Sequence, residues 1–190
     1  MKKTILSIAA LICTTAAFVQ KDTTGLNIPV KDGAVVYERI MDAPGKSKAD
    51  LYKNAKQWFV DYFKSSKYVI QNEDKEDGKI VGKGILFVAF RGALGSNVIY
   101  NDKLSFQVDC KENKYRVRVY EQTLSSPGNE LSTTPESLIG KLLEKEKSPF
   151  NDKQARRMLE SMNATITTTL FAFNKAMVAK SDDLQYRICF

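Results

Sequence analysis

Apolar residues recur at intervals of three and four positions in two stretches of the chain, residues 47–63 and residues 152–179. That spacing places the apolar side chains on one face of a helix, so both stretches are predicted to be amphipathic helices. Ser47, with Asp50 three residues later, resembles a capping box at the start of the first helix. A shorter helix is predicted to begin at Pro135, because proline favours the first helical position.

The segments between the helices are rich in β-branched and aromatic residues, partly in alternation with polar ones, as half-buried strands are. One strand precedes the first helix and four follow it in succession, over residues 34–41, 68–74, 80–90, 98–111 and 114–124. Four consecutive antiparallel strands need helices on one face to bury their apolar side. The order therefore predicts an α+β fold: a strand, a helix and a four-stranded antiparallel meander, followed by helices packed on one face of the sheet.

The turn at Glu112-Asn113 fixes the register that we expect for the last hairpin. On one face it pairs apolar residues, Cys110 with Tyr115, Val108 with Val117 and Phe106 with Val119. On the other face it pairs mostly polar residues, Asp109 with Arg116, Gln107 with Arg118 and Ser105 with Tyr120. One apolar and one polar face are typical of a sheet that is covered on a single side. We call the side turned away from the helices the open face.

The dipeptide Asp77-Gly78, between two β-rich runs, predicts another hairpin, closed by a two-residue turn. That register places Ile70 opposite Ile85. On the second strand of this hairpin, we expect Leu86 and Val88 to lie on the open face.

The N-terminus has the three parts of a secretory signal peptide: two lysines, an apolar run over residues 5–13, and small residues at positions 15–17. We therefore predict cleavage before Phe18, so that residues 1–17 are a signal peptide. The protein is then exported, to the periplasm, the cell envelope or the outside of the cell.

A transmembrane anchor and a lipoprotein are the alternatives for this segment. An anchor needs about 20 apolar residues, and this run is shorter and is interrupted by Thr14 and Thr15. A lipid on Cys13 requires a small residue before the cysteine, and Ile12 is large and β-branched. We therefore expect soluble export without a transmembrane anchor.

The length of 190 residues suits one domain with a sizeable core. After the signal peptide we expect an irregular leader over residues 18–32 and a core domain over residues 33–124. Residues 125–190 are predicted to be a helical extension that ends in an apolar tail and packs on the same domain.

The composition limits the kinds of catalytic and metal-binding site that the chain can form. The chain contains no histidine, which removes the usual zinc and copper ligand and the usual general base near neutral pH. No pairing of nucleophile and base stands out either, so we expect no catalytic residue, metal site or cofactor. Loss of the two lysines of the signal peptide lowers the formal net charge from +7 to +5, an excess that favours anionic partners only weakly.

Cys110 and Cys189 are the cysteines that remain after cleavage. Export exposes both to oxidising conditions, where a disulfide between them would pin the tail to the core. A free buried thiol at Cys110, on the apolar side of the sheet, fits the sequence equally well.

Two groups of residues resemble a known family. The first comprises Pro44-Gly45-Lys46-Ser47-Lys48, Leu51-Tyr52 and Lys56-Gln57-Trp58-Phe59, and the second comprises Val69-Ile70-Gln71, Glu73-Asp74-Lys75-Glu76 and Gly82-Lys83-Gly84. Over about residues 29–124 the chain is similar to a bacterial exported domain of unknown function with a TBP-like fold, one like that of the TATA-box-binding protein. The resemblance implies a curved antiparallel sheet with helices on its convex side, and export. It implies no activity or cofactor, and a likeness of fold carries no claim about DNA.

The open face is where we expect function. It should carry Gln107, Arg116, Arg118 and Tyr120 together with Leu86 and Val88, beside the bare backbone of Gly82 and Gly84. Arginine and tyrosine often anchor interfaces. The sequence therefore predicts a non-catalytic binding or interaction module of the bacterial cell envelope, whose partner is a protein or an anionic ligand. The alternative is that long side chains and the loop over residues 91–103 simply cover this face.

Two other functions are kept as alternatives. One is a small exported hydrolase with an unrecognised site. The other is polyanion or nucleic-acid binding on the open face, where Tyr120 would stack and the arginines would neutralise phosphate. Export argues against nucleic acid, because it separates the protein from intracellular DNA and RNA. The sequence leaves the oligomeric state open.

Overall fold

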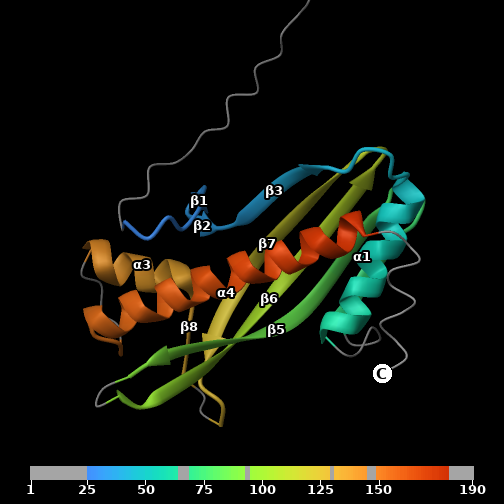
Figure 1. Cartoon of the computed structure of the whole chain (residues 1–190). Coiled ribbons are helices and arrows are strands. Elements are labelled where there is room, and N and C mark those ends of the chain that lie inside the picture. The colour runs from blue at the N-terminus through green and yellow to red at the C-terminus, as the bar shows by residue number, and fades with distance from the viewer. Residues whose placement is uncertain (1–24, 64–68, 93–94, 129–130, 145–148, 180–190) are drawn as a thin grey trace, which may run out of the picture.

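In the part of the chain that the computed structural model describes, three helices lie on one side of a strongly twisted antiparallel sheet (Figure 1). The structure describes residues 25–63, 69–92, 95–128, 131–144 and 149–179. The main sheet has six strands in the order β3-β7-β6-β5-β4, with β8 paired to β7. Its strands are β3 (Tyr37–Asp42), β4 (Ile70–Asp74), β5 (Lys79–Arg91), β6 (Asn97–Lys111), β7 (Lys114–Ser125) and β8 (Ser132–Thr133).

The helices are α1 (Lys48–Phe63), α3 (Pro135–Glu144) and α4 (Asp152–Val178), close to the predicted ranges. The Ser47 hydroxyl accepts a hydrogen bond from the Asp50 backbone N–H at 3.1 Å and donates one to the Asp50 carboxylate at 2.7 Å. A capping box of Asn151 and Gln154 starts α4. Side-chain caps satisfy N–H groups that a helix leaves unpaired in its first turn. The two long helices therefore begin where the sequence supplies caps.

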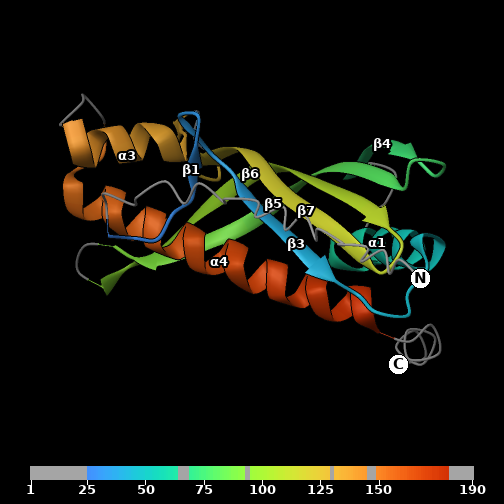
Figure 2. The ribbon, with the colours of Figure 1, turned by 90° about the horizontal axis from the view of Figure 1, so that it is seen from above.

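Aromatic rings from α1 and α4 meet over the same face of the sheet. The Trp58 ring lies 5.0 Å from that of Phe106 on β6 and 4.9 Å from that of Phe173 on α4, and Phe173 also contacts Tyr115. The predicted placement of both long helices on one face is confirmed. Viewed from above, α4 runs obliquely along the sheet, with α3 beside its N-terminal half (Figure 2).

The register predicted for the last hairpin is confirmed. Cys110 pairs with Tyr115, Val108 with Val117 and Phe106 with Val119, and the polar pairs are also those expected. Asn113 takes the left-handed backbone conformation in the turn, with φ of 61°, a conformation that asparagine tolerates better than most residues. The short turn and the clean alternation together left a single register open to this hairpin.

The register predicted for β4 and β5 is wrong. Asp74 pairs with Lys79, and Ile70 pairs with Gly82 rather than with Ile85. The turn spans four residues instead of two, and the Asp77 backbone N–H donates to the Asp74 carboxylate at 2.9 Å. A register shift next to Ile70 moves the pairing further from the expected one.

Leu86 and Val88 were predicted on the open face, and this too is wrong. Leu86 pairs with Asp102 and Val88 with Tyr100, on the face that the helices cover. Their side chains are buried, 5% and 0% exposed. Both belong to the core, which the helices close.

Gly82 and Gly84 also lie on the helix-covered face, where the prediction had placed open backbone. A Cβ atom on Gly82 would come within 2.7 Å of Cε1 of Phe59, and one on Gly84 would overlap the ring of Phe63. The missing side chains thus make room for two aromatic rings of α1.

The predicted irregular leader contains a small hairpin at its end. Here β1 (Val30–Lys31) pairs with β2 (Ala34–Val35), and Ile28 is buried in the core. The predicted strand over residues 34–41 is accordingly divided between β2 and β3.

Several predictions concern residues outside the described ranges. These are the signal peptide over residues 1–17, Cys13, the apolar tail and Cys189. Cys110 is buried, and burial raises the pKa of its thiol to about 12. Its disulfide with Cys189 stays a prediction. In the described part of the chain, no helix combines the length and apolar character that a membrane span requires.

Asp102 is a carboxylate inside the core. It stands on the helix-covered face of β6, 0% exposed, and neither carboxylate oxygen has a hydrogen-bond partner among the described residues. Burial disfavours its ionised form and raises its pKa to about 7.

Substitution of Gly82 by alanine should destabilise the protein by about 1–3 kcal/mol, because the new methyl group pushes against the fully buried Phe59 ring. The effect runs against β propensity, which disfavours glycine in strands. Urea denaturation measures it, with Lys83→Ala on the opposite face as the control, expected within about 0.5 kcal/mol of wild type. Equal stability of the two variants would contradict the packing described for α1.

The free energy of unfolding should fall as the pH rises from about 4 to about 7, because the unfolded chain ionises Asp102 in this window while the folded protein keeps it protonated. The slope due to this group is at most about 1.4 kcal/mol per pH unit. Denaturation of wild type and of Asp102→Asn across this pH range separates the contribution of Asp102 to the pH dependence from that of the other carboxylates. Identical pH slopes for the two proteins would show that the carboxyl group titrates normally.

Candidate functional site

The open face carries side chains from β3, β5, β6 and β7. Gln107, Arg116, Arg118 and Tyr120 lie there as the sequence predicted, brought together by the pairing of β6 with β7. Leu86 and Val88 are excluded, because they point into the core. The structure thus confirms the positions of four of the six predicted residues and removes two.

Polar side chains of this face form two groups of contacts, Gln107, Asp109 and Arg116 in one and Glu38, Arg118 and Tyr120 in the other, and we call the two together the polar ladder. Asp109 accepts hydrogen bonds from Nε of Arg116 at 3.1 Å and from the Gln107 amide at 3.0 Å. Nε of Arg118 lies 3.2 Å from Oε2 of Glu38, near enough for an ion pair although not aligned for a hydrogen bond. Arg118 also covers the Tyr120 ring, 5.4 Å from its centroid.

These contacts give the polar ladder a balanced charge. Each arginine faces a carboxylate, Arg116 on Asp109 and Arg118 on Glu38. An anionic ligand would have to compete with these carboxylates for the guanidinium groups. The polar ladder is therefore less suited to a polyanion than the sequence alone implied.

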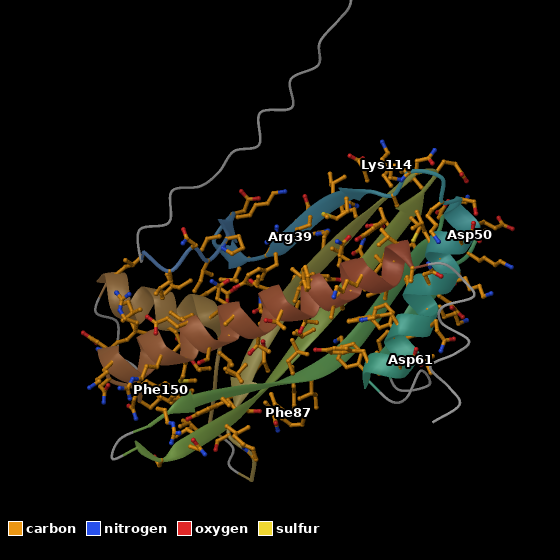
Figure 3. All side chains as sticks on the ribbon, viewed as in Figure 1. Arg39, Asp50, Asp61, Phe87, Lys114 and Phe150 are labelled. Carbon is orange, nitrogen blue, oxygen red and sulfur yellow. The ribbon has the colours of Figure 1, made fainter. Side chains whose placement is uncertain are left out.

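An exposed apolar patch lies beside the polar ladder. We define it as Ile85, Phe87 and Ala89 of β5 with Ile99 of β6, which is the cross-strand partner of Ala89. Phe87 is 71% exposed, Ile85 46% and Ile99 48%. Figure 3 shows Phe87 projecting from the side of β5 away from α4. Contiguous exposed apolar side chains are more informative than single ones, because soluble proteins tend to avoid them.

The sequence contained a signal for this patch. Lys79, Lys83 and Arg91 share the odd-numbered side of β5 with Ile85 and Phe87. Charged residues are rarely buried, so their common parity points to solvent for all of them. The pattern of apolar residues alone does not show which side of β5 is buried, since both sides of the strand carry them.

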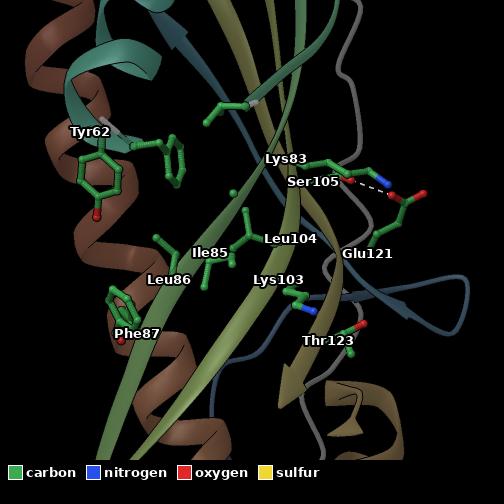
Figure 4. Close-up of a pocket in the computed structure, with 14 residues that line it drawn as sticks. Tyr62, Lys83, Ile85, Leu86, Phe87, Lys103, Leu104, Ser105, Glu121 and Thr123 are labelled. Carbon is green, nitrogen blue, oxygen red and sulfur yellow. Dashed lines mark hydrogen bonds between the residues drawn. The ribbon is translucent and has the colours of Figure 1, made fainter. Parts of the chain in front are cut away.

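A shallow groove of about 1080 Å³ follows β5 along the apolar patch. Its walls come from both sides of the strand: Ile85, Phe87 and Lys103 on the open face, and Tyr62 and Phe63 at the end of α1 on the other. Figure 4 shows Tyr62 across β5 from Lys103, Ser105 and Glu121. The groove is thus wrapped around an edge of the sheet.

A bulge between β6 and β7 shapes the far side of the groove. The register shifts between Lys103 and Ser105, and Glu121 takes a φ of 54°. The Ser105 hydroxyl donates a hydrogen bond of 2.6 Å to the Glu121 carboxylate (Figure 4). Bulges re-aim side chains, and they are over-represented next to functional sites.

Comparison with known proteins bears on the fold. Residues 37–123 match the model of a family described as a domain of unknown function (DUF4468) with TBP-like fold. That range includes the polar ladder, the apolar patch and the bulge. The match covers 87 of the 190 residues.

Solved structures agree with the match to the DUF4468 family. A DUF4468 family protein from Bacteroides ovatus superimposes with a TM-score of 0.63 at 22% identity, over 85% of this chain and 98% of that one. A TBP-like protein from Parabacteroides distasonis gives 0.60 at 17% identity, over 80% and 99%. Likeness at these identities shows the fold. No curated protein matches the sequence.

The DUF4468 region and the rest of the described chain contain no group of three or more Cys, Asp or Glu side chains placed to hold a metal ion. The polar ladder places no nucleophile beside a base. The open face offers a partly apolar surface with hydrogen-bonding groups and an adjoining groove.

Proposed function

We propose that this protein is a non-catalytic binding module, exported to the cell envelope or beyond, that takes up a protein partner on its open face. The observation that carries the proposal is the apolar patch around Phe87, which is exposed although the described helices cover the other face of the sheet. Exposed apolar patches rimmed by polar residues commonly mark sites of protein interaction.

The polar ladder supports this function as a rim. Its ion pairs hold Arg116, Arg118 and Tyr120 in place, so little conformational freedom is lost when a partner contacts them. Flat groups of this kind are enriched among the residues that dominate binding energy. Export, proposed from the residues 1–17 described above, sets the compartment in which the partner is sought.

Photo-crosslinking in the cells that make the protein tests the proposal. A benzophenone amino acid at position 87 should give a discrete crosslinked product, because Phe87 lies in the contact. Position 171 on α4 is the matched control. Phe171 is also an exposed phenylalanine, with 62% of its surface accessible against 71% for Phe87, but it lies on the helix side of the molecule. A product at position 87 and none at 171 is expected. No product at 87, or the same products at both positions, would contradict the proposal.

A further inference from the structure

The outer half of β5 has a strand partner on one side only. β6 pairs with β5 along its whole length, from Lys79 to Arg91. On the other side β4 pairs no further than Gly82. From Lys83 onward no described strand lies beside this edge, and the groove runs along it.

The direction of the backbone groups along this edge follows from two hydrogen bonds. The Cys110 N–H donates to the Gly78 carbonyl, and the Gly92 N–H donates to the Ser96 carbonyl, both at 2.8 Å. In an antiparallel ladder without a register shift, bonded pairs recur at every second residue. Even-numbered residues from 78 to 92 therefore bond to β6, and odd-numbered ones direct their N–H and C=O groups outward.

One contact supports this assignment. The carbonyl of the odd-numbered Arg91 accepts a hydrogen bond from the Arg157 guanidinium of α4 at 2.6 Å, and the carbonyl of Gly92, at the end of the strand, accepts a longer one of 3.3 Å. Beyond the pairing of Ile70 with Gly82, Ile85, Phe87 and Ala89 have outward backbone groups with no partner strand among the described residues. Such a row is a template for another strand.

Ile85, Phe87 and Ala89 also turn their side chains to the open face, where they form part of the apolar patch. Lys83 and Lys103 stand at its end next to the bulge, and neither forms an ion pair with a described carboxylate. The edge thus combines unpaired backbone groups and an apolar strip with two lysines at one end.

We propose that this edge binds an extended segment of a partner protein as an added β-strand, with apolar residues at alternate positions and acidic residues at its ends. This inference rests on the proposed binding function and names the class of partner. Main-chain hydrogen bonds would supply affinity, and contacts with alternate side chains would supply selectivity. Seven residues, 83–89, span about 23 Å in a strand, room for a segment of similar length.

The charge of the edge selects this occupant over a second copy of the chain. Antiparallel pairing of two β5 edges centred on Phe87 sets Lys83 of one copy opposite Arg91 of the other. Like charges directly opposite each other destabilise a strand pair. An acidic segment meets the same lysines with opposite charge.

A blocked, fluorescently labelled peptide of alternating Val and Thr with Glu at both ends is the probe, and anisotropy with the exported full chain is the measurement. We expect saturable binding, and about tenfold weaker binding when the end residues are Lys. N-methylation of every second peptide nitrogen along one edge removes its main-chain donors, and should weaken binding by at least about tenfold. Ala89→Pro should have a similar effect, because proline blocks an outward N–H that the native sheet does not use.

The outcomes separate this inference from the proposed function. Crosslinking at position 87 combined with binding that neither N-methylation nor Ala89→Pro affects would overturn strand addition and leave the binding module intact. No binding of the Glu-ended peptide at millimolar concentration would overturn it too. So would sedimentation showing a dimer that Ala89→Pro dissociates, because the occupant would then be a second copy. Failure of both experiments would remove the proposed function as well.

Discussion

The packing of α1 on two glycines of β5 decides which side of that strand is buried. Phe59 and Phe63 occupy the space that side chains at Gly82 and Gly84 would fill, so the even-numbered side of β5 faces the helices. Because every second side chain of a strand lies on the same face, Leu86 and Val88 also point into the core. Ile85, Phe87 and Ala89 must then face outward, where no described element covers them. The exposed apolar patch is therefore a consequence of how tightly the helix approaches the sheet.

The sequence predicted the elements that local chemistry determines. Helix starts followed from Ser47 and Pro135, and the β6–β7 register followed from a short turn at Asn113 and clean alternation on both sides of it. The positions of Arg116, Arg118 and Tyr120 on one face came with that register. Local signals sufficed here because each was backed by a pattern of the same period.

The β4–β5 hairpin and the apolar patch could not be read in the same way. Asp77-Gly78 signals a tight turn, yet the Asp74 carboxylate closes a longer one. Both sides of β5 carry apolar residues, so its buried side depends on Phe59 and Phe63, which are distant in sequence. Ion pairing of Arg118 likewise depends on Glu38 of β3, a partner that the fold brings beside β7. Tertiary contacts, not local pattern, fixed each of these features.

The account depends most on the outer half of β5 being an open edge with its odd-numbered residues directed outward. Residue-by-residue hydrogen exchange by NMR on the full chain tests this directly, because exchange slows where an amide is hydrogen-bonded inside a sheet. The amides of Ile85, Phe87 and Ala89 should exchange at nearly unprotected rates. Those of Gly84, Leu86 and Val88 should be protected by at least about a hundredfold. Uniform protection along residues 83–89 would show that the edge is already covered, and protection of the odd-numbered amides alone would show that the strand faces the other way.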